Sequence, residues 1–429
     1  MSCIVLEHCT LWDGTSPEVR EDMHVLVEGE RIREISERSI TVPQAQVIDC
    51  QGKTLMPGLI DAHVHLIATC LNLSQLAQEP MSLTMARARH IAEGMLRRGF
   101  TTVRDAGGAD WGLAAAIDYG LIDGPRLFYA GRALSQTGGH GDFRSRTVET
   151  DQCACCMAGT QFSVIADGVP EVQKAVRQEL RRGATQIKIM ASGGVASPTD
   201  PVWNLQYSDD EIRAVVWEAR SWHTYVMAHA YTPEAVARCV RLGVRSIEHG
   251  NLLDQETATL MAREGAFLVP TLVTYEALHR EGKQWGLPQV SIDKIHDVRE
   301  AGLQSLEWAK SAGVQIGFGT DLLGETHHYQ SLELSLRAQV LSSFEVLQSA
   351  TITNAALLNR AGELGVLAPG ALADMLLVDG NPLDDLTLLQ EQGQHLLLIM
   401  KNGQLLHIAP CGRTLGTSTL ASGAGPWRA

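Results

Sequence analysis

The chain contains the apolar run Met56-Pro57-Gly58-Leu59-Ile60-Asp61-Ala62-His63-Val64-His65-Leu66. It opens at a Pro-Gly turn and is typical of a buried β-strand. Side chains two residues apart on a strand leave the same face, so His63 and His65 can both reach one metal ion beyond the strand's end. A single His-x-His among 15 histidines can arise by chance. The metal hypothesis therefore requires further ligands downstream.

Four more ionisable residues stand near the ends of apolar runs. Lys188 lies in residues 186–190, His229 in residues 226–230 and His249 in residues 246–250, and a fourth run ends in Asp321. These residue types are the ones that bind metals or move protons. Their recurrence at the ends of separate runs indicates one shared site.

Strand-like and helical runs alternate through the middle of the chain. Eight strands are predicted, at residues 59–65, 101–105, 126–130, 186–190, 225–230, 246–249, 266–270 and 315–319. Helical patterns occupy residues 85–98, 170–182, 208–222, 233–242 and 254–263. Eight strands with crossover helices predict an α/β fold, a (β/α)8 TIM barrel with its active site at the C-terminal ends of the strands. All six ionisable residues would then meet at the barrel mouth, the end of the barrel where the strands have their C-terminal ends.

Both ends of the chain are rich in short β-type pieces, at residues 3–6, 24–28, 31–35, 45–50, 373–379 and 396–406. We expect residues 1–56 and 365–411 to form one small discontinuous β-sandwich domain, with the catalytic barrel at residues 57–364. Residues 412–429 have the composition of a flexible tail. The long loop of residues 135–168 is expected to act as a lid or wall of the site.

Composition favours a globular protein of a reducing compartment. Hydrophobic residues make up 45% and charged residues 20%, and no apolar stretch reaches the roughly 18 residues of a membrane span. The net charge of -14 argues against nucleic-acid or anionic membrane partners. Nine irregularly spaced cysteines and a start without a secretory pattern lead us to expect a cytoplasmic protein.

A cluster of Cys153, Cys155 and Cys156 could bind a soft metal. It lacks a second cysteine pair at zinc-finger spacing. We therefore favour loop thiols that are sensitive to oxidation.

Residues 57–65, the later single histidines and Gly319-Thr320-Asp321 resemble the amidohydrolase superfamily, and so do residues 369–379. The resemblance spans nearly the whole chain. A closer likeness is to two-metal Xaa-Pro dipeptidases and related carboxy-terminal dipeptide hydrolases, carried by residues 138–141, 187–194 and 228–231. Some of these relatives hydrolyse the amide of ochratoxin.

The resemblance implies a site with two divalent metal ions. His63, His65 and Asp321 would hold one, His229 and His249 the other, and carboxylated Lys188 and a hydroxide would lie between them. Carboxylation needs a neutral amine. Burial must therefore lower the lysine pKa, whose unperturbed value is about 10.4. A lysine paired with a carboxylate is the alternative, which an apolar strand disfavours. Nitrogen and oxygen ligands suit zinc, with manganese or cobalt as substitutes.

The resemblance also implies that Asp321 accepts a proton from the attacking water and passes it to the leaving amine. A helix cap is the alternative for this residue. Tyr231 and His140 are candidates for holding the substrate's carbonyl or carboxylate. Tyr231 lies two residues past His229 on the same strand face, whereas His140 stands in a loop where it could be solvated.

Two further pairs of residues near the predicted barrel mouth are not assigned to the site. Arg144 and Arg146 lie in the long loop and could pair with a terminal carboxylate, but solvated charges are the favoured interpretation. His327 and His328 follow Asp321 and match no ligand position.

The predicted function is hydrolysis of amide bonds in dipeptides or N-acyl amino acids with a free carboxylate, ochratoxin A among the candidates. The alternative is a cyclic amide hydrolase or deaminase of the imidazolone or cytosine type, whose sites generally lack the bridging lysine. A non-enzymatic scaffold is a third interpretation, which the complete ligand set disfavours. The partner is expected to be a small-molecule amide, and the resemblance implies a homo-oligomer.

Overall fold

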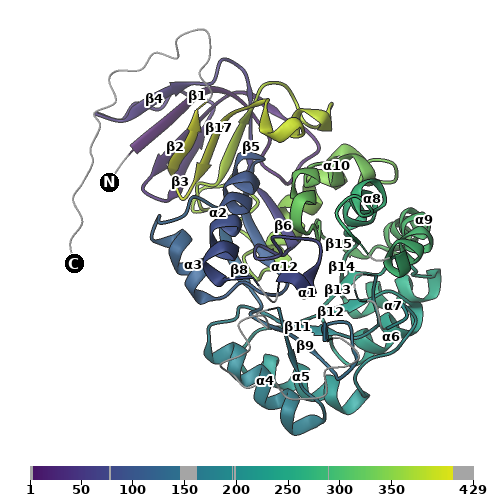
Figure 1. The fold of residues 1–429 in the computed structure, drawn as a ribbon. Coiled ribbons are helices and arrows are strands. Elements are labelled where there is room, and N and C mark those ends of the chain that lie inside the picture. The colour runs from purple at the N-terminus through teal and green to yellow at the C-terminus, as the bar shows by residue number, and fades with distance from the viewer. Residues whose placement is uncertain are drawn as a thin grey trace.

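The computed structural model describes residues 3–76, 79–144, 162–195, 197, 200–287 and 289–408. The tail expected at residues 412–429, the cysteine cluster and Arg146 lie outside this part of the chain. Figure 1 shows a barrel with helices around it and a separate sheet at one side, in which strands from both chain ends lie together.

Parallel strands form the barrel in two ladders. One ladder has the order β6 (Leu59–Val64), β7 (Phe100–Asp105), β8 (Arg126–Tyr129). The other has the order β10 (Ser163–Ile165), β9 (Ala133–Ser135), β11 (Ile187–Met190), β12 (Val226–Ala230), β13 (Ser246–His249), β14 (Phe267–Val269), β15 (Gln315–Ile316). Backbone hydrogen bonds connect the two ladders to each other. The Ala62 amide donates to the Phe318 carbonyl over 2.8 Å, and the Thr185 amide donates to the Tyr129 carbonyl over 2.9 Å. The predicted TIM barrel is confirmed.

Two short strands were not predicted. The third barrel strand is interrupted after Tyr129 and resumes as β9, and β10 pairs with β9 inside the segment expected to be a long loop. Each has three residues, which is too few to show a period of two.

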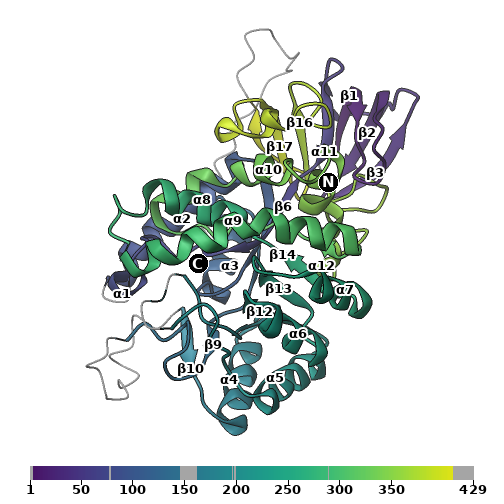
Figure 2. The same ribbon diagram turned by 90° about the vertical axis from the view of Figure 1, so that its right-hand side faces the viewer.

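Helices cover the outside of the barrel, as Figure 2 shows for α4 to α9. The helices are α1 (Leu73–Leu76), α2 (Met81–Arg97), α3 (Trp111–Asp118), α4 (Val169–Arg181), α5 (Asp209–Ser221), α6 (Pro233–Arg241), α7 (Gln255–Glu264), α8 (Leu272–Glu281), α9 (Gln289–Ala312), α10 (Leu332–Arg337), α11 (Ser343–Gln348) and α12 (Asn354–Leu357). Short helical turns are η1 (Gly324–Tyr329), η2 (Ser349–Thr353), η3 (Leu386–Leu389) and η4 (Glu391–Gly393). The five predicted helices are present. Caps explain their starts: Ser208 and Glu211 form a capping box on α5, and Asp254 caps α7.

The two chain ends share one mixed sheet. Its order is β18 (Gln404–Ile408), β17 (Leu396–Lys401), β16 (Met375–Val378), β5 (Thr54–Pro57), β1 (Cys3–Leu11), β2 (Arg20–Glu28), β3 (Arg31–Ser36), and β4 (Gln46–Asp49) pairs with β1. The antiparallel pair of β5 and β16 joins the N-terminal and C-terminal segments. The predicted discontinuous β domain is therefore confirmed as one hydrogen-bonded sheet, while its boundaries along the chain stay a prediction.

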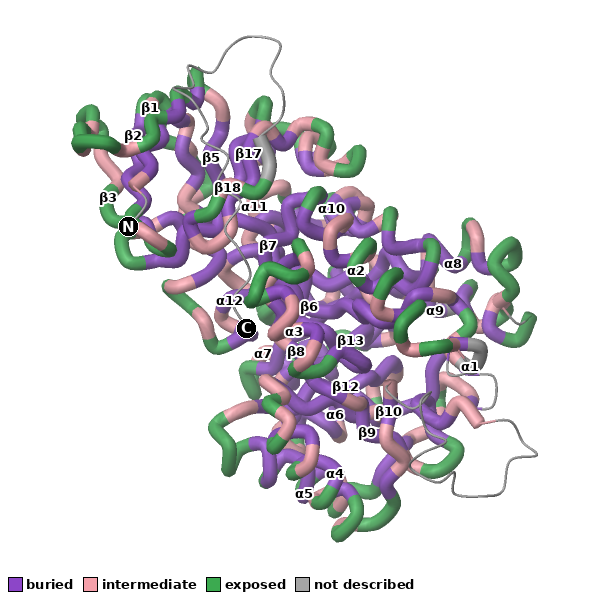
Figure 3. Tube along the Cα trace, turned by 60° about the vertical axis from the view of Figure 1, so that its left-hand side comes forward, coloured by how far each residue is buried: buried purple, intermediate pink, exposed green. Residues whose placement is uncertain are grey.

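Several barrel strands are fully buried. Every residue of β6, β7, β12 and β13 is buried, and Figure 3 shows exposed residues on the outer helices and turns. Within the described residues, no helix combines the length and apolarity that crossing a membrane requires.

The first and last barrel strands are tied together by Asp61. Its fully buried carboxylate accepts hydrogen bonds from Thr320 Oγ1 at 2.7 Å, Gln330 Nε2 at 2.9 Å and the His63 amide at 3.1 Å. Asp61 therefore holds the strand that carries His63 next to the segment that carries Asp321.

We expect Asp61→Ala to lower the free energy of unfolding by about 3 kcal/mol, because it leaves buried donors without an acceptor. Urea unfolding of the metal-free chain measures this loss. Asp210→Ala is the control: the Asp210 side chain is 81% exposed in its pair with Arg213, so its loss changes stability by about 0.5 kcal/mol or less. Equal stability of the two variants would contradict the role of Asp61.

Candidate metal centre

The six predicted ligand residues come together at the C-terminal ends of the barrel strands. His63 and His65 stand at the end of β6, and their Nε2 atoms lie 3.3 Å and 3.1 Å from Asp321 Oδ1. The His63 ring centroid lies 5.1 Å from that of His249 at the end of β13. One part of the centre is therefore formed by three histidines around a single carboxylate.

His229 and Lys188 form the other part of the centre. The ring centroids of His229 and His249 lie 4.5 Å apart. Lys188 is 1% exposed on the neighbouring strand β11, and burial lowers the pKa of its amine to about 8. The pKa of this buried amine is therefore shifted in the direction that carboxylation requires.

The protonation states of His229, His249 and Asp321 suit a divalent cation, whereas for His65 burial lowers the pKa but Asp321 outweighs it and raises the pKa. Burial, together with the charges of His140, His249 and Lys188, holds the pKa of His229 well below its usual value. Burial likewise lowers the pKa of His249. For Asp321, burial raises the pKa, but the neighbouring His63 and His65 outweigh it and hold the carboxyl well below its usual range. Neutral imidazoles and an ionised carboxylate are the forms that ligate metals.

The geometry also fits a metal. One ligand atom each from His63, His249 and Asp321 lies within 4.8 Å of the others. His63 Nε2 is buried and makes no hydrogen bond, although it lies 3.3 Å from Asp321 Oδ1, and a polar atom left in this state is costly unless something else binds it. These residues therefore fit a divalent metal centre.

Buried partners orient the histidines. His63 Nδ1 lies 2.6 Å from Glu248 Oε2, His65 Nδ1 lies 2.8 Å from the Gly107 carbonyl, and His249 Nδ1 lies 2.8 Å from Thr271 Oγ1. With Nδ1 occupied, Nε2 of His63 and of His65 is left to face Asp321. Such outer contacts set the tautomer and direction of a ligating imidazole.

Three residues around the centre have left-handed backbones, His249 at φ 74°, Asp321 at φ 52° and Thr271 at φ 47°. This conformation costs a non-glycine residue about 1 kcal/mol or more. Strain of this kind persists where the surroundings hold it, and it clusters at functional sites. Here it occurs at two predicted ligands and at one ligand's hydrogen-bond partner.

The predicted substrate residues border the centre. The His140 ring stacks on His229 with centroids 4.2 Å apart, and the Tyr231 ring stacks on His249 at 5.2 Å. His140 is 8% exposed and its Nδ1 lies 2.7 Å from Ser197 Oγ. The solvated alternative for His140 is therefore wrong, because its loop folds back over β12.

The loop after β11 must approach His140 closely. A Cβ at Gly194 would lie 2.2 Å from the His140 ring, so only glycine fits there. Lys294 of α9 holds this loop by donating to the carbonyls of Gly194, Ser197 and Asp200 over 2.7 to 2.9 Å.

Sequence analysis missed several residues of the centre. Glu248 and Arg104 are charged residues inside predicted strands, a signal that was available, and they form a fully buried ion pair of 2.9 Å. Thr271 and Tyr275 gave no signal; Tyr275 places its hydroxyl 2.7 Å from that of Tyr231.

The residues without an assigned role have local partners. His327 is buried with Nε2 3.3 Å from the Ala68 carbonyl, and His328 Nδ1 lies 2.8 Å from the Glu325 carbonyl. Arg144 pairs with Asp142 over 2.6 Å.

A cavity of about 570 Å³ lies at the other end of the barrel, lined by Arg220, Tyr225, Arg241, Arg245 and other residues at the N-terminal ends of β12 to β14. It adjoins the C-terminal ends of α5 and α6, where arginines balance the helix dipoles. The cavity is therefore separate from the metal centre.

Comparison with known proteins gives consistent matches. The family model described as "Amidohydrolase family" matches residues 54–406. Ochratoxinase of Aspergillus niger is 33% identical over 388 residues, which are 87% of this chain and 77% of that protein. A crystal structure of an amidohydrolase has a TM-score of 0.93 at 54% identity and covers 95% of this chain and 99% of its own. A prolidase crystallised with N-methylphosphonate-L-proline has a TM-score of 0.92 at 51% identity, covering 94% and 99%.

We expect Thr271→Val to weaken zinc binding by about tenfold or more, because it removes the hydroxyl that orients His249 while keeping the side-chain shape. Competition with a chromophoric chelator measures the affinity. Thr271→Ser is the matched control, since it keeps the hydroxyl and should bind zinc nearly as the parent does. Equal affinities of the two variants would show that the hydroxyl does not orient His249.

Proposed function

The chain belongs to the amidohydrolase family, and on this premise we propose that it hydrolyses the amide bond of dipeptides or N-acyl amino acids that carry a free carboxylate. As a family member it is a metal-dependent hydrolase that acts on C–N bonds. The finer proposal concerns the substrate and the roles of individual residues.

One observation carries this proposal: Tyr231 and His140 lie directly against His229 and His249. A substrate held by these two side chains has its scissile carbonyl beside the metal centre. The prolidase relative at 51% identity binds a phosphonate joined to proline, a ligand with a charged tetrahedral group next to an amino acid carboxylate. A similar ligand class suits this chain.

His63, His65 and Asp321 would hold one divalent metal and His229 and His249 a second, with carboxylated Lys188 between them. Zinc is the proposed metal, because the donors are imidazole nitrogen and carboxylate oxygen. Bound metals would supply Lewis acidity, which polarises a carbonyl and acidifies water.

Asp321 is suited to move the proton. Its carboxylate is ionised at neutral pH because His63 and His65 hold its pKa well below the usual range. From its place beside His63 and His65 it would accept a proton from the attacking water and deliver it to the leaving amine, which is a poor leaving group without that proton.

Tyr231 is suited to donate a hydrogen bond. Burial raises the pKa of its hydroxyl above the usual value, so the hydroxyl stays protonated. Its contact with Tyr275 fixes its position. A fixed donor stabilises negative charge on a carbonyl oxygen or a carboxylate.

The bridging role of Lys188 is tested by substitution. We expect Lys188→Ala to lower bound metal and hydrolysis together by about two orders of magnitude with the fold intact, because the bridging anion is lost. Metal analysis, circular dichroism and initial rates measure these effects. Exposed Lys283→Ala is the control, and full activity of Lys188→Ala would refute the bridging role.

Carboxylation predicts a pH and bicarbonate dependence. Carbon dioxide reacts with the neutral amine, whose fraction grows as the pH rises through the lowered Lys188 pKa of about 8. Reconstitution of the metal-free chain with Zn²⁺ should be accelerated by bicarbonate, and should slow by about tenfold per pH unit below that value. Reconstitution indifferent to bicarbonate would contradict carboxylation.

A substrate panel tests the proposed function. It contains N-acyl amino acids and dipeptides with varied carboxy-terminal residues, ochratoxin A included, and the matching carboxy-terminal amides. We expect the free acids to be hydrolysed at least about tenfold faster than the amides, because a carboxylate forms charge-assisted hydrogen bonds that an amide cannot. Equal rates would contradict the free-carboxylate requirement, and activity confined to cyclic amides would favour the imidazolone-type alternative.

For the substrates that are hydrolysed, Tyr231→Phe should lower kcat/KM by about a hundredfold, because a fixed hydrogen-bond donor is lost. Tyr119→Phe is the control, since Tyr119 is 78% exposed on the outside of the barrel. Unchanged kinetics in Tyr231→Phe would remove this residue from the substrate site.

A further inference from the structure

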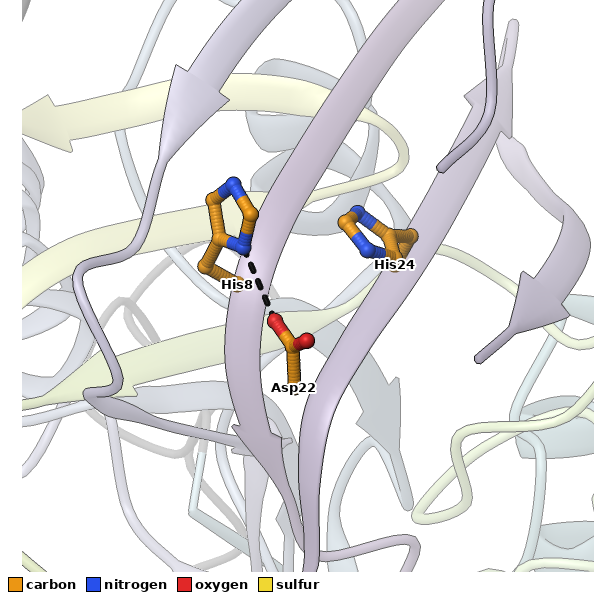
Figure 4. A group of neighbouring side chains, drawn as sticks. All are labelled: His8, Asp22 and His24. Atoms are coloured by element: carbon orange, nitrogen blue, oxygen red, sulfur yellow. Dashed lines mark hydrogen bonds and ion pairs between the residues drawn. The ribbon is translucent and has the colours of Figure 1, made fainter. Parts of the chain in front are cut away.

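A second cluster of metal-ligating side chains lies in the β domain, away from the barrel mouth. It consists of His8 on β1 and of Asp22 and His24 on β2. One ring nitrogen of each histidine and one carboxylate oxygen lie within 4.8 Å of one another. Figure 4 shows the three side chains turned toward one another from the two strands.

Two opposed irregularities in the strand pair create this arrangement. From the Leu6–Val25 pair to the Cys9–Met23 pair, β1 advances three residues and β2 two, so His8 is an added residue opposite His24. From Cys9–Met23 to Leu11–Arg20 the excess lies on β2, where Asp22 is located. Bulges of this kind re-aim side chains.

Both bulge residues have strained backbones. His8 and Asp22 have φ of 53°, a left-handed conformation that is unfavourable for a residue with a Cβ. The neighbouring loop holds His8 in place, because the Gly52 amide donates to the His8 carbonyl over 2.7 Å. The conformation is thus supported by the surrounding fold.

His24 gives an independent indication of a ligand. Its side chain is buried, with 2% exposure, and its Nδ1 has no hydrogen-bond partner. An unpartnered buried nitrogen is costly, and the contact between His8 Nδ1 and Asp22 Oδ1 at 2.8 Å does not satisfy it. A metal ion bound by all three side chains removes this deficit.

We propose that His8, Asp22 and His24 bind a divalent transition-metal ion that clamps β1 to β2. Two imidazoles and a carboxylate form a donor set that suits Zn²⁺ and Co²⁺. Ligand atoms around a tetrahedral ion stand about 3.3 Å apart, and the three candidate ligand atoms here lie within 4.8 Å of one another. His8 and Asp22 have room to adjust around an ion, since their side chains are 53% and 74% exposed.

The surroundings favour a cation. Asp22, Asp49 and Glu7 all raise the pKa of His8, which shows that the electrostatic potential at this ring is negative. A proton therefore competes with the metal for His8, and metal uptake should weaken as the pH falls. This site does not depend on the reaction proposed for the barrel.

The test is a Co²⁺ titration of the full chain after it has received only the two equivalents of Zn²⁺ proposed for the barrel. Visible absorption and native mass spectrometry measure the uptake. We expect about one further equivalent in the parent, and at least about tenfold weaker uptake in His8→Ala and in Asp22→Ala. Both changes are at exposed side chains, so the fold should survive, which thermal unfolding without metal verifies.

The matched control is His90→Ala, which removes a histidine that is 85% exposed on α2 and should keep the additional equivalent. The unfolding temperature should rise with Zn²⁺ in the parent and in His90→Ala, but not in His8→Ala. No uptake beyond the barrel site in the parent, or equal uptake in His8→Ala and His90→Ala, would overturn the proposal.

Discussion

The ion pair between Arg104 and Glu248 lies inside the barrel, with both side chains fully buried at 2.9 Å. Arg104 also donates to the Ala62 carbonyl, and Glu248 holds His63 Nδ1. The pair thus connects β6, β7 and β13. A buried charge is costly unless it is paired and hydrogen-bonded, and here each of the two charges meets that requirement through the other.

This pair sets the charge balance beneath the metal centre. Burial raises the pKa of Glu248, but Arg104 and then His63 outweigh it and keep the carboxylate ionised. An ionised Glu248 orients the His63 imidazole, and it also faces Lys188, whose pKa it raises while burial lowers it. The same low dielectric therefore makes the pair necessary and lowers the pKa of the Lys188 amine.

Much of the barrel was predictable because its strands and helices have local periods. Lys188, His229 and His249 each interrupt an apolar run near a strand's end, and parallel strands bring such ends to one face. The continuation of the third strand as β9 and the strand β10 were missed, because segments of three residues carry no period. The lid expected at residues 135–168 lies partly outside the described residues, and the described part contains β10 and the buried His140.

The sequence by itself determined the order of strands and helices, the joining of both chain ends in one domain, and the residue types that meet at the barrel mouth. Tertiary structure alone decided which groups orient the residues of the site. Arg104 and Glu248 are 144 residues apart, Thr271 contacts His249 through a left-handed backbone, and His8 meets Asp22 and His24 through two bulges. Local periodicity is encoded in neighbouring residues, whereas these contacts exist only after the barrel and the sheet have closed.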